Sequence, residues 1–85
     1  GIPQFEIPVS MLREGGVGVI SLCTEHAAIF PSKGEARKLI QGGGVSLNKK
    51  KIASIDAVVT ESDLISNKYL LVQKGKKNYF LIIAK

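Results

Sequence analysis

The chain has 85 residues, 45% of them hydrophobic, which is enough to bury one small core and too much for a disordered tail. Its 12 lysines and arginines against 7 acidic residues give a net charge of +5, which favours a polyanionic partner, either nucleic acid or a membrane surface. No apolar run approaches the roughly 20 residues of a membrane-spanning helix, and the first residues do not resemble a signal peptide.

Residues 1–16 give the weakest structural signal. Pro3 and Pro8 interrupt any helix, so only a short capped turn is expected before the first regular element. The chain also starts with Gly1 rather than methionine, so we expect it to be a fragment of a longer protein. We interpret residues 1–16 as a linker from the missing part of that protein, partly packed on a single domain formed by residues 17–85.

The apolar spacing becomes helical at Val19. Hydrophobic and small residues recur at intervals of three and four as far as Phe30, which predicts an amphipathic helix of about ten residues that Pro31 ends. Cys23 and His26 fall on its apolar face, so we expect both to be packed and unreactive. A single cysteine favours a reducing, cytoplasmic setting, and one cysteine with one histidine is too few ligands for a metal site.

A second helix is predicted over residues 33–41. Ser32 is a favourable N-cap, and Glu35 three residues later completes a capping box. Three glycines at residues 42–44 end the helix, because glycine readily adopts the left-handed cap conformation. The polar side of this helix carries four candidate ligands for phosphate: Lys33, Arg37, Lys38 and Gln41.

The remaining sequence has the alternation and the short apolar runs of β-strands. Strands are expected near residues 45–48, 57–59, 69–73 and 79–83, with Lys49, Lys50 and Lys51 forming a turn after the first of them. Gly75 lies between the last two strands, which predicts a hairpin. The fold class is therefore α+β, with two short helices followed by a small antiparallel sheet of three or more strands.

Positive charge gathers in two clusters. The first runs from residue 33 to 51 and is opposed only by Glu35, and the second comprises Lys74, Lys76 and Lys77. Lysines and arginines supply affinity for phosphates, and the free N–H groups of a helix N-terminus at Ser32 suit the same ligand. Each cluster also has an ordinary interpretation as a solvated surface, and Asn48 suits the turn at a strand end equally well.

Residues 32–48, with the sequence SKGEARKLIQGGGVSLN, resemble the RNA-binding module named after ribosomal protein S-four. That segment alone leaves several RNA-binding families open. Residues 71–82, with the sequence LVQKGKKNYFLI, are similar to the last hairpin of bacterial-type tyrosyl-tRNA synthetases. The two motifs occur in the expected order and spacing, and together the resemblance covers residues 17–85.

The resemblance implies an S-four-like fold and a C-terminal domain that binds tRNA(Tyr) by its long variable arm and anticodon stem. The parent would be a homodimeric, ATP-dependent tyrosine–tRNA ligase, whereas this fragment would be monomeric, would hold no cofactor and would carry no catalytic residue. The implied RNA-binding residues are Ser32, Lys33, Arg37, Lys38, Gln41, Asn48, Lys49, Lys50, Lys51, Lys74, Lys76 and Lys77. Two alternatives remain, namely a stand-alone ribosome- or RNA-associated module of the S-four type and a protein-interaction domain.

Overall fold

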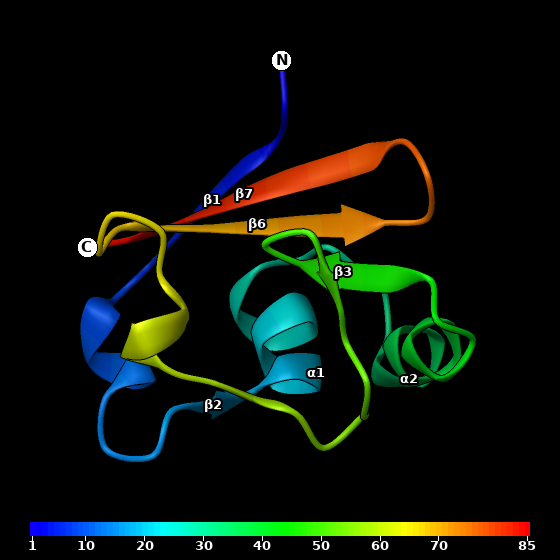
Figure 1. Cartoon of the computed structure of the whole chain (residues 1–85), viewed down its shortest axis with the longest axis horizontal. Coiled ribbons are helices and arrows are strands. Elements are labelled where there is room, and N and C mark those ends of the chain that lie inside the picture. The colour runs from blue at the N-terminus through cyan, green and yellow to red at the C-terminus, as the bar shows by residue number, and fades with distance from the viewer.

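The computed structural model describes residues 1–85 and contains one large and one small β-sheet, with every helical element on the same side of the large sheet (Figure 1). The large sheet has five strands in the order β1–β7–β6–β3–β4. Their bounds are β1 Gln4–Ile7, β3 Val45–Leu47, β4 Lys50–Lys51, β6 Tyr69–Lys74 and β7 Asn78–Ala84. The small sheet pairs β2 (Val17–Gly18) with β5 (Val58–Val59) in antiparallel fashion. The α+β class predicted from the sequence is confirmed.

The second predicted helix is α2 (Lys33–Gln41), with the bounds expected from its capping signals. The backbone N–H of Glu35 donates to Oγ of Ser32 at 3.2 Å, which satisfies one of the free amides of the first turn. Ala36 and Ile40 are buried and Leu39 is partly buried against the core, while Arg37 and Lys38 are exposed. Local capping and spacing were therefore sufficient to place this helix.

The first helix is shorter than predicted and changes its geometry. α1 (Val19–Ser21) continues into a π-helical turn, η2 (Leu22–His26), in which the N–H of Ala27 donates to the carbonyl of Leu22, five residues earlier, at 2.8 Å. A π-helical turn contains more residues than the 3.6 of an α-helical turn, so the side chains after it point in other directions than the α-helical period predicts. The predicted packing of His26 is wrong, because its side chain is exposed, whereas the predicted burial of Cys23 is confirmed.

The large sheet is mixed, so the predicted wholly antiparallel sheet is wrong in one respect. β7 pairs with β6 in the expected antiparallel hairpin, and β3 pairs antiparallel with both β4 and β6. However, β1 runs parallel to β7, with Gln4 opposite Leu81 and Ile7 opposite Ala84. The first residues therefore extend the sheet at its edge, followed by the 3₁₀-helix η1 (Val9–Leu12).

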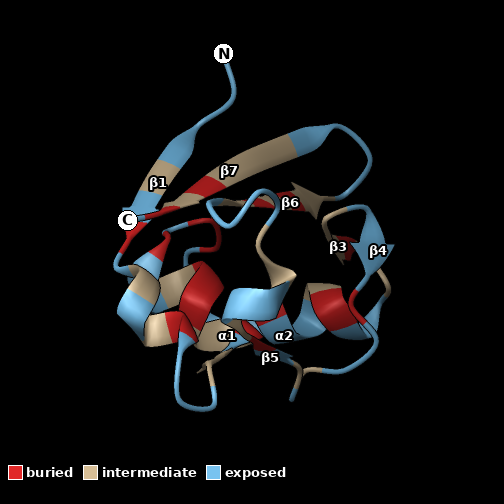
Figure 2. Ribbon diagram, turned by 60° about the vertical axis from the view of Figure 1, so that its left-hand side comes forward, coloured by how far each residue is buried: buried red, intermediate tan, exposed pale blue.

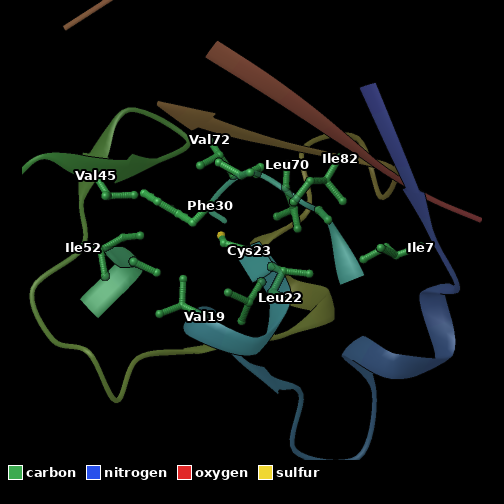
Figure 3. Close-up of a cluster of buried hydrophobic side chains, with 14 of the residues drawn as sticks. Ile7, Val19, Leu22, Cys23, Phe30, Val45, Ile52, Leu70, Val72 and Ile82 are labelled. Carbon is green, nitrogen blue, oxygen red and sulfur yellow. The ribbon is translucent and has the colours of Figure 1, made fainter. Parts of the chain in front are cut away.

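The core contains 17 buried residues, all of them apolar, contributed by the strands, the helices and the loops between them (Figures 2 and 3). Ile7 and Leu12 belong to this core, which shows that the segment preceding residue 17 is packed on the domain along much of its length. A second 3₁₀-helix, η3 (Glu61–Asp63), begins with a capping box, in which the side chains of Thr60 and Asp63 each bond the other residue's backbone N–H.

Burial raises the pKa of the Cys23 thiol to about 12 from an ordinary value of 9.0. The thiolate is the reactive species, so the folded protein is expected to be alkylated by iodoacetamide roughly 1000-fold more slowly at Cys23 than the unfolded chain. The measurement is the alkylation rate at pH 8, followed by mass spectrometry, with and without denaturant. Rapid alkylation of the folded protein would show that this part of the core opens.

Candidate nucleic-acid interface

Three basic segments meet at the glycine turn (residues 42–44) that joins α2 to β3. The N–H of Gly75 donates to the carbonyl of Gly44 at 2.7 Å, which holds the β6–β7 turn against it. On the other side, a Cβ built at Gly43 would lie 3.4 Å from Nζ of Lys51. The C-terminal end of α2, the start of the β6–β7 turn and the side chain of Lys51 are thus neighbours, although they are far apart in the sequence.

Only Gly43 in this turn needs to be glycine for conformational reasons, because its φ is +76°. Gly44 lies close to α2, since a Cβ there would lie 3.1 Å from Cγ of Leu39 and would have to displace that side chain slightly. The backbone of the turn therefore approaches its neighbours without any obstructing side chain. A polyanion lying over it would meet free cations on several sides.

Most of the predicted ligands are exposed and form no ion pair in the structure. The uncommitted cations near the glycine turn are Lys38, Lys51, Lys76 and Lys77, with Arg37 and Gln41 exposed on α2. Nε2 of Gln73 donates to the carbonyl of Lys76 at 3.1 Å, which helps to fix the β6–β7 turn. The positive charge of these uncommitted cations is therefore available to a ligand.

Two predicted cations already have protein partners. Nζ of Lys33 lies 2.6 Å from Oε1 of Glu25, and this contact holds the pKa of the Glu25 carboxyl below its usual value. Nζ of Lys74 donates to the carbonyl of Ile29 at 3.3 Å and lies 5.0 Å from the centre of the Phe30 ring. Lys74 points to the core side of the sheet, so it is less available to phosphate than its neighbours in the turn.

The N-terminus of α2 remains open to a ligand even though Ser32 is used as its cap. Oγ of Ser32 accepts only the N–H of Glu35, which leaves earlier amides of the first turn without an intrahelical partner. A Cβ built at Gly34 would meet no atom within 4 Å, so space exists beside these amides. Ser32 and Lys33 lie at the opposite end of α2 from the glycine turn, a separation of about 13 Å along the helix axis at 1.5 Å per residue.

Asn48, Lys49 and Lys50 lie at the far end of β3 from the glycine turn. Asn48 and Lys49 have φ values of 52° and 70° and form the tight turn before β4, so Lys50 and Lys51 are strand residues rather than turn residues. Lys50 and Lys51 also line a pocket of about 380 Å³ between β4 and β5, whose walls combine apolar and polar residues. The structure thus separates Lys49 and Lys50 from the cations around the glycine turn.

Asn48 has structural partners for both ends of its side chain. Nδ2 donates to the carbonyl of Asp63 at 2.6 Å, and Oδ1 accepts the N–H of Leu71 at 2.9 Å. These bonds tie the β3–β4 turn to η3 and to β6. Of the two roles considered from the sequence, the structural role has direct support.

Replacing Asn48 by alanine is expected to destabilise the fold by about 2–3 kcal/mol, because it leaves the N–H of Leu71 unpaired and keeps a positive φ. The measurement is the free energy of unfolding in urea. Asn67→Ala is the matched control, since Asn67 has a φ of 58° and no side-chain hydrogen bond, and it should cost about 1 kcal/mol or less. Equal losses in the two variants would show that only backbone strain matters.

The role of Gly75 as the joint between the two basic clusters was not predicted from the sequence. Gly75 has a φ of +73° and was assigned only as a hairpin residue, which it is. Its bond to Gly44 crosses 31 positions of the sequence, and no local pattern signals it. The presence of glycine in both turns was the only available signal.

None of the helices has the length and apolar character that a membrane-spanning segment needs. The structure also contains no group of three or more histidine, cysteine, aspartate or glutamate side chains arranged to hold a metal ion.

Comparison with known proteins identifies relatives along the whole chain. The sequence profile of a family described as the tyrosine–tRNA ligase SYY-like C-terminal domain matches residues 2–82. The chain is 62% identical over 85 residues to the tyrosine–tRNA ligase of Bacteroides fragilis, covering 100% of this chain and 20% of that protein. The corresponding protein of Bacteroides thetaiotaomicron is 61% identical over the same length. That of Flavobacterium johnsoniae is 43% identical over 82 residues, covering 96% of this chain and 19% of its own length.

The chain therefore spans about a fifth of the length of the curated relatives it matches. The match to the family profile begins at residue 2, so it includes the segment that forms β1 and η1, where the sequence analysis found no family motif.

Proposed function

The chain belongs to the family of tyrosine–tRNA ligase C-terminal domains, and from this premise we propose that it binds the tRNA specific for tyrosine. The observation that carries the proposal is the meeting of three basic segments at the glycine turn (residues 42–44). Cations from α2, β4 and the β6–β7 turn surround a backbone that no side chain obstructs. Such a surface suits the sugar–phosphate backbone of a folded RNA.

The mechanism is electrostatic attachment followed by recognition of shape. Lys38, Lys51 and the lysines of the β6–β7 turn neutralise phosphates, and the counterions that they release make the affinity depend on salt. Arg37 and Gln41 offer hydrogen-bond donors to phosphates and 2′-hydroxyls along the same helix. The open amides at the N-terminus of α2, beside Ser32 and Lys33, provide a further phosphate site.

In finer detail, we propose that the domain has the S-four-like fold and grips the long variable arm and the anticodon stem of the tRNA. The width of the basic surface, from the N-terminus of α2 to the β6–β7 turn, supports contact with more than one stretch of backbone. Lys49 and Lys50, at the far end of β3, would touch a separate part of the RNA. Lys74 would act mainly by stabilising the β6–β7 turn through its contacts with Ile29 and Phe30 on the core side of the sheet.

The chemistry of the parent protein would lie outside this chain. In the proposed arrangement, tyrosine activation with ATP and transfer to tRNA take place in the remaining four fifths of a homodimeric ligase of the cytoplasm. This domain binds and positions the tRNA, and it holds no cofactor and no metal of its own.

The test is binding of this chain to tyrosine tRNA, intact and with a shortened variable arm, over a series of salt concentrations. Neutralising about five phosphates should give a slope of about −3.5 to −4.5 in a plot of log affinity against log salt. Weaker binding of the shortened tRNA would locate the contact at the variable arm. No binding to either RNA at low salt would contradict the proposal.

A further inference from the structure

The face of the large sheet that points away from the helices is apolar at its centre. Side chains alternate between the two faces of a strand, and the core side of β6 and β7 is marked by the buried Leu70, Val72 and Ile82. The alternate positions form what we call the outer face: Tyr69, Leu71, Tyr79, Leu81 and Ile83. All five are partly exposed, and none of them belongs to the set of residues packed against the core.

These side chains form one continuous stripe. Tyr69 pairs with Ile83 and Leu71 with Leu81 across the β6–β7 hairpin, while Tyr79 lies opposite Gln73. The helical elements all lie on the opposite side of the sheet (Figure 1). In an antiparallel hairpin with one solvated face, the solvent-side positions are ordinarily polar.

The polar side chains of this face are confined to its borders. Gln4 and Glu6 of β1 lie along one edge, because they pair with Leu81 and Ile83. Ser46 of β3 lies along the other, beside Gln73. An apolar centre with a polar rim is typical of a surface that is covered by another protein surface.

We propose that the outer face is the docking surface for the part of the ligase polypeptide that precedes this domain. The inference rests on the proposed function, in which this chain is one part of a tyrosine–tRNA ligase. In the relatives, the matched segment is about a fifth of the protein, and its family is that of the C-terminal domain. The preceding polypeptide of such a protein joins the domain through its first residues.

Those first residues lie at the border of the outer face. The carbonyl of Pro3 accepts the N–H of Leu81 at 2.9 Å, so the chain enters the domain beside the centre of the stripe. Ile2, immediately before it, is 50% exposed and would extend the apolar surface toward the incoming polypeptide. The polypeptide that precedes Gly1 could therefore lie across β7 and β6 without a long connecting loop.

The chemistry of the stripe favours protein over RNA as its occupant. Leu71, Leu81 and Ile83 are aliphatic and offer neither charge nor a ring on which a base can stack. Glu6 borders the stripe and pairs with Lys85 at 2.7 Å, so the cation at this edge is already engaged by a carboxylate. Tyr69 and Tyr79 combine apolar rings with hydroxyl groups, as is common at the centres of protein interfaces.

Photocrosslinking in the full-length ligase tests the proposal directly. Leu81 is replaced by p-benzoylphenylalanine, the purified protein is irradiated without tRNA, and crosslinked peptides are mapped by mass spectrometry. The expected product joins residue 81 to a peptide from the polypeptide preceding Gly1. Val58 is the matched control, because it is an apolar strand residue that is 52% exposed but belongs to the small sheet. The absence of any crosslink from residue 81, or crosslinks only to this same domain of a second copy, would overturn the proposal.

A second variant measures the consequence of docking. Leu71→Thr with Leu81→Thr keeps side chains that suit strands while removing the apolar centre, and Val58→Thr is its control. The pair of substitutions should raise the radius of gyration in X-ray scattering and speed proteolysis before Gly1 about tenfold. Unchanged scattering and proteolysis would overturn the docking proposal.

The same variant separates this proposal from the proposed function. If the domain docks through the outer face, tRNA binding should keep its salt slope in the Leu71→Thr, Leu81→Thr variant, since the cations around the glycine turn are untouched. A loss of tRNA binding without any change in scattering would assign the outer face to RNA and overturn the docking proposal. Failure of tRNA binding in the unsubstituted protein would instead count against the proposed function.

Discussion

Replacing Lys38, Lys76 and Lys77 together by glutamine is expected to weaken the binding of tyrosine tRNA about 100-fold at low salt. All three side chains are exposed and form no ion pair, and they surround the glycine turn (residues 42–44) from α2 and from the β6–β7 turn. If each neutralises one phosphate, the salt slope should also become less steep by about 2 to 3. The measurement is the affinity of both proteins over the same salt series.

The matched control removes the same amount of charge elsewhere. Arg13, Lys68 and Lys85 are replaced by glutamine. Two of these cations form exposed ion pairs with glutamates, and Lys68 lies 5.6 Å from the centre of the Tyr69 ring. Exposed ion pairs contribute little to stability, so this variant should fold. It should keep the salt slope and lose less than about fivefold in affinity. Equal losses in the two variants would show that net charge alone attracts the RNA.

The parts of the fold that were predicted correctly are those whose signals are local. Three signals for α2 lie within 13 residues: an N-cap, the helical spacing of its apolar and basic residues, and the glycines that end it. Each of them depends only on residues that are close in the sequence. The β6–β7 hairpin likewise depends on Gly75 and on the two apolar runs beside it. Such features need no knowledge of the rest of the molecule.

The parts that were not predicted depend on contacts between distant residues or on a change of helical period. The parallel pairing of β1 with β7 joins opposite ends of the chain, and two prolines flank β1. His26 was placed in the core by assuming 3.6 residues per turn, whereas the π-helical turn of η2 carries it into solvent. Neither outcome has a signature in the spacing of the residues involved.

The candidate site divides in the same way. The two basic clusters can be read from the sequence, because charge counts need no structure. Their meeting point cannot, because it depends on the bond between Gly75 and Gly44. The different availability of Lys74 and Lys76 to phosphate also depends on tertiary contacts. The two lysines lie two positions apart, but only Lys74 contacts Ile29 and Phe30.

Replacing Gly16 by alanine is expected to destabilise the fold by about 3 kcal/mol or more, for two separate reasons. The φ of Gly16 is +77°, which side chains rarely adopt. In addition, a Cβ there would lie only 2.3 Å from the carbonyl oxygen of Val59 and 2.9 Å from Cγ2 of Thr60. Val59 is a buried residue of β5, so relief of this contact must displace the small sheet from the core. The measurement is the free energy of unfolding in urea.

The neighbouring glycine separates the two causes. Gly15 has a φ of +97°, but a Cβ there would meet no atom within 4 Å. Gly15→Ala should therefore show the backbone strain alone, about 1 to 2 kcal/mol. The excess loss in Gly16→Ala would then measure the close approach of Gly16 to β5. If both variants lose the same free energy of unfolding, the small sheet can move away from residue 16 at little cost, and the close contact between them does not stabilise the domain.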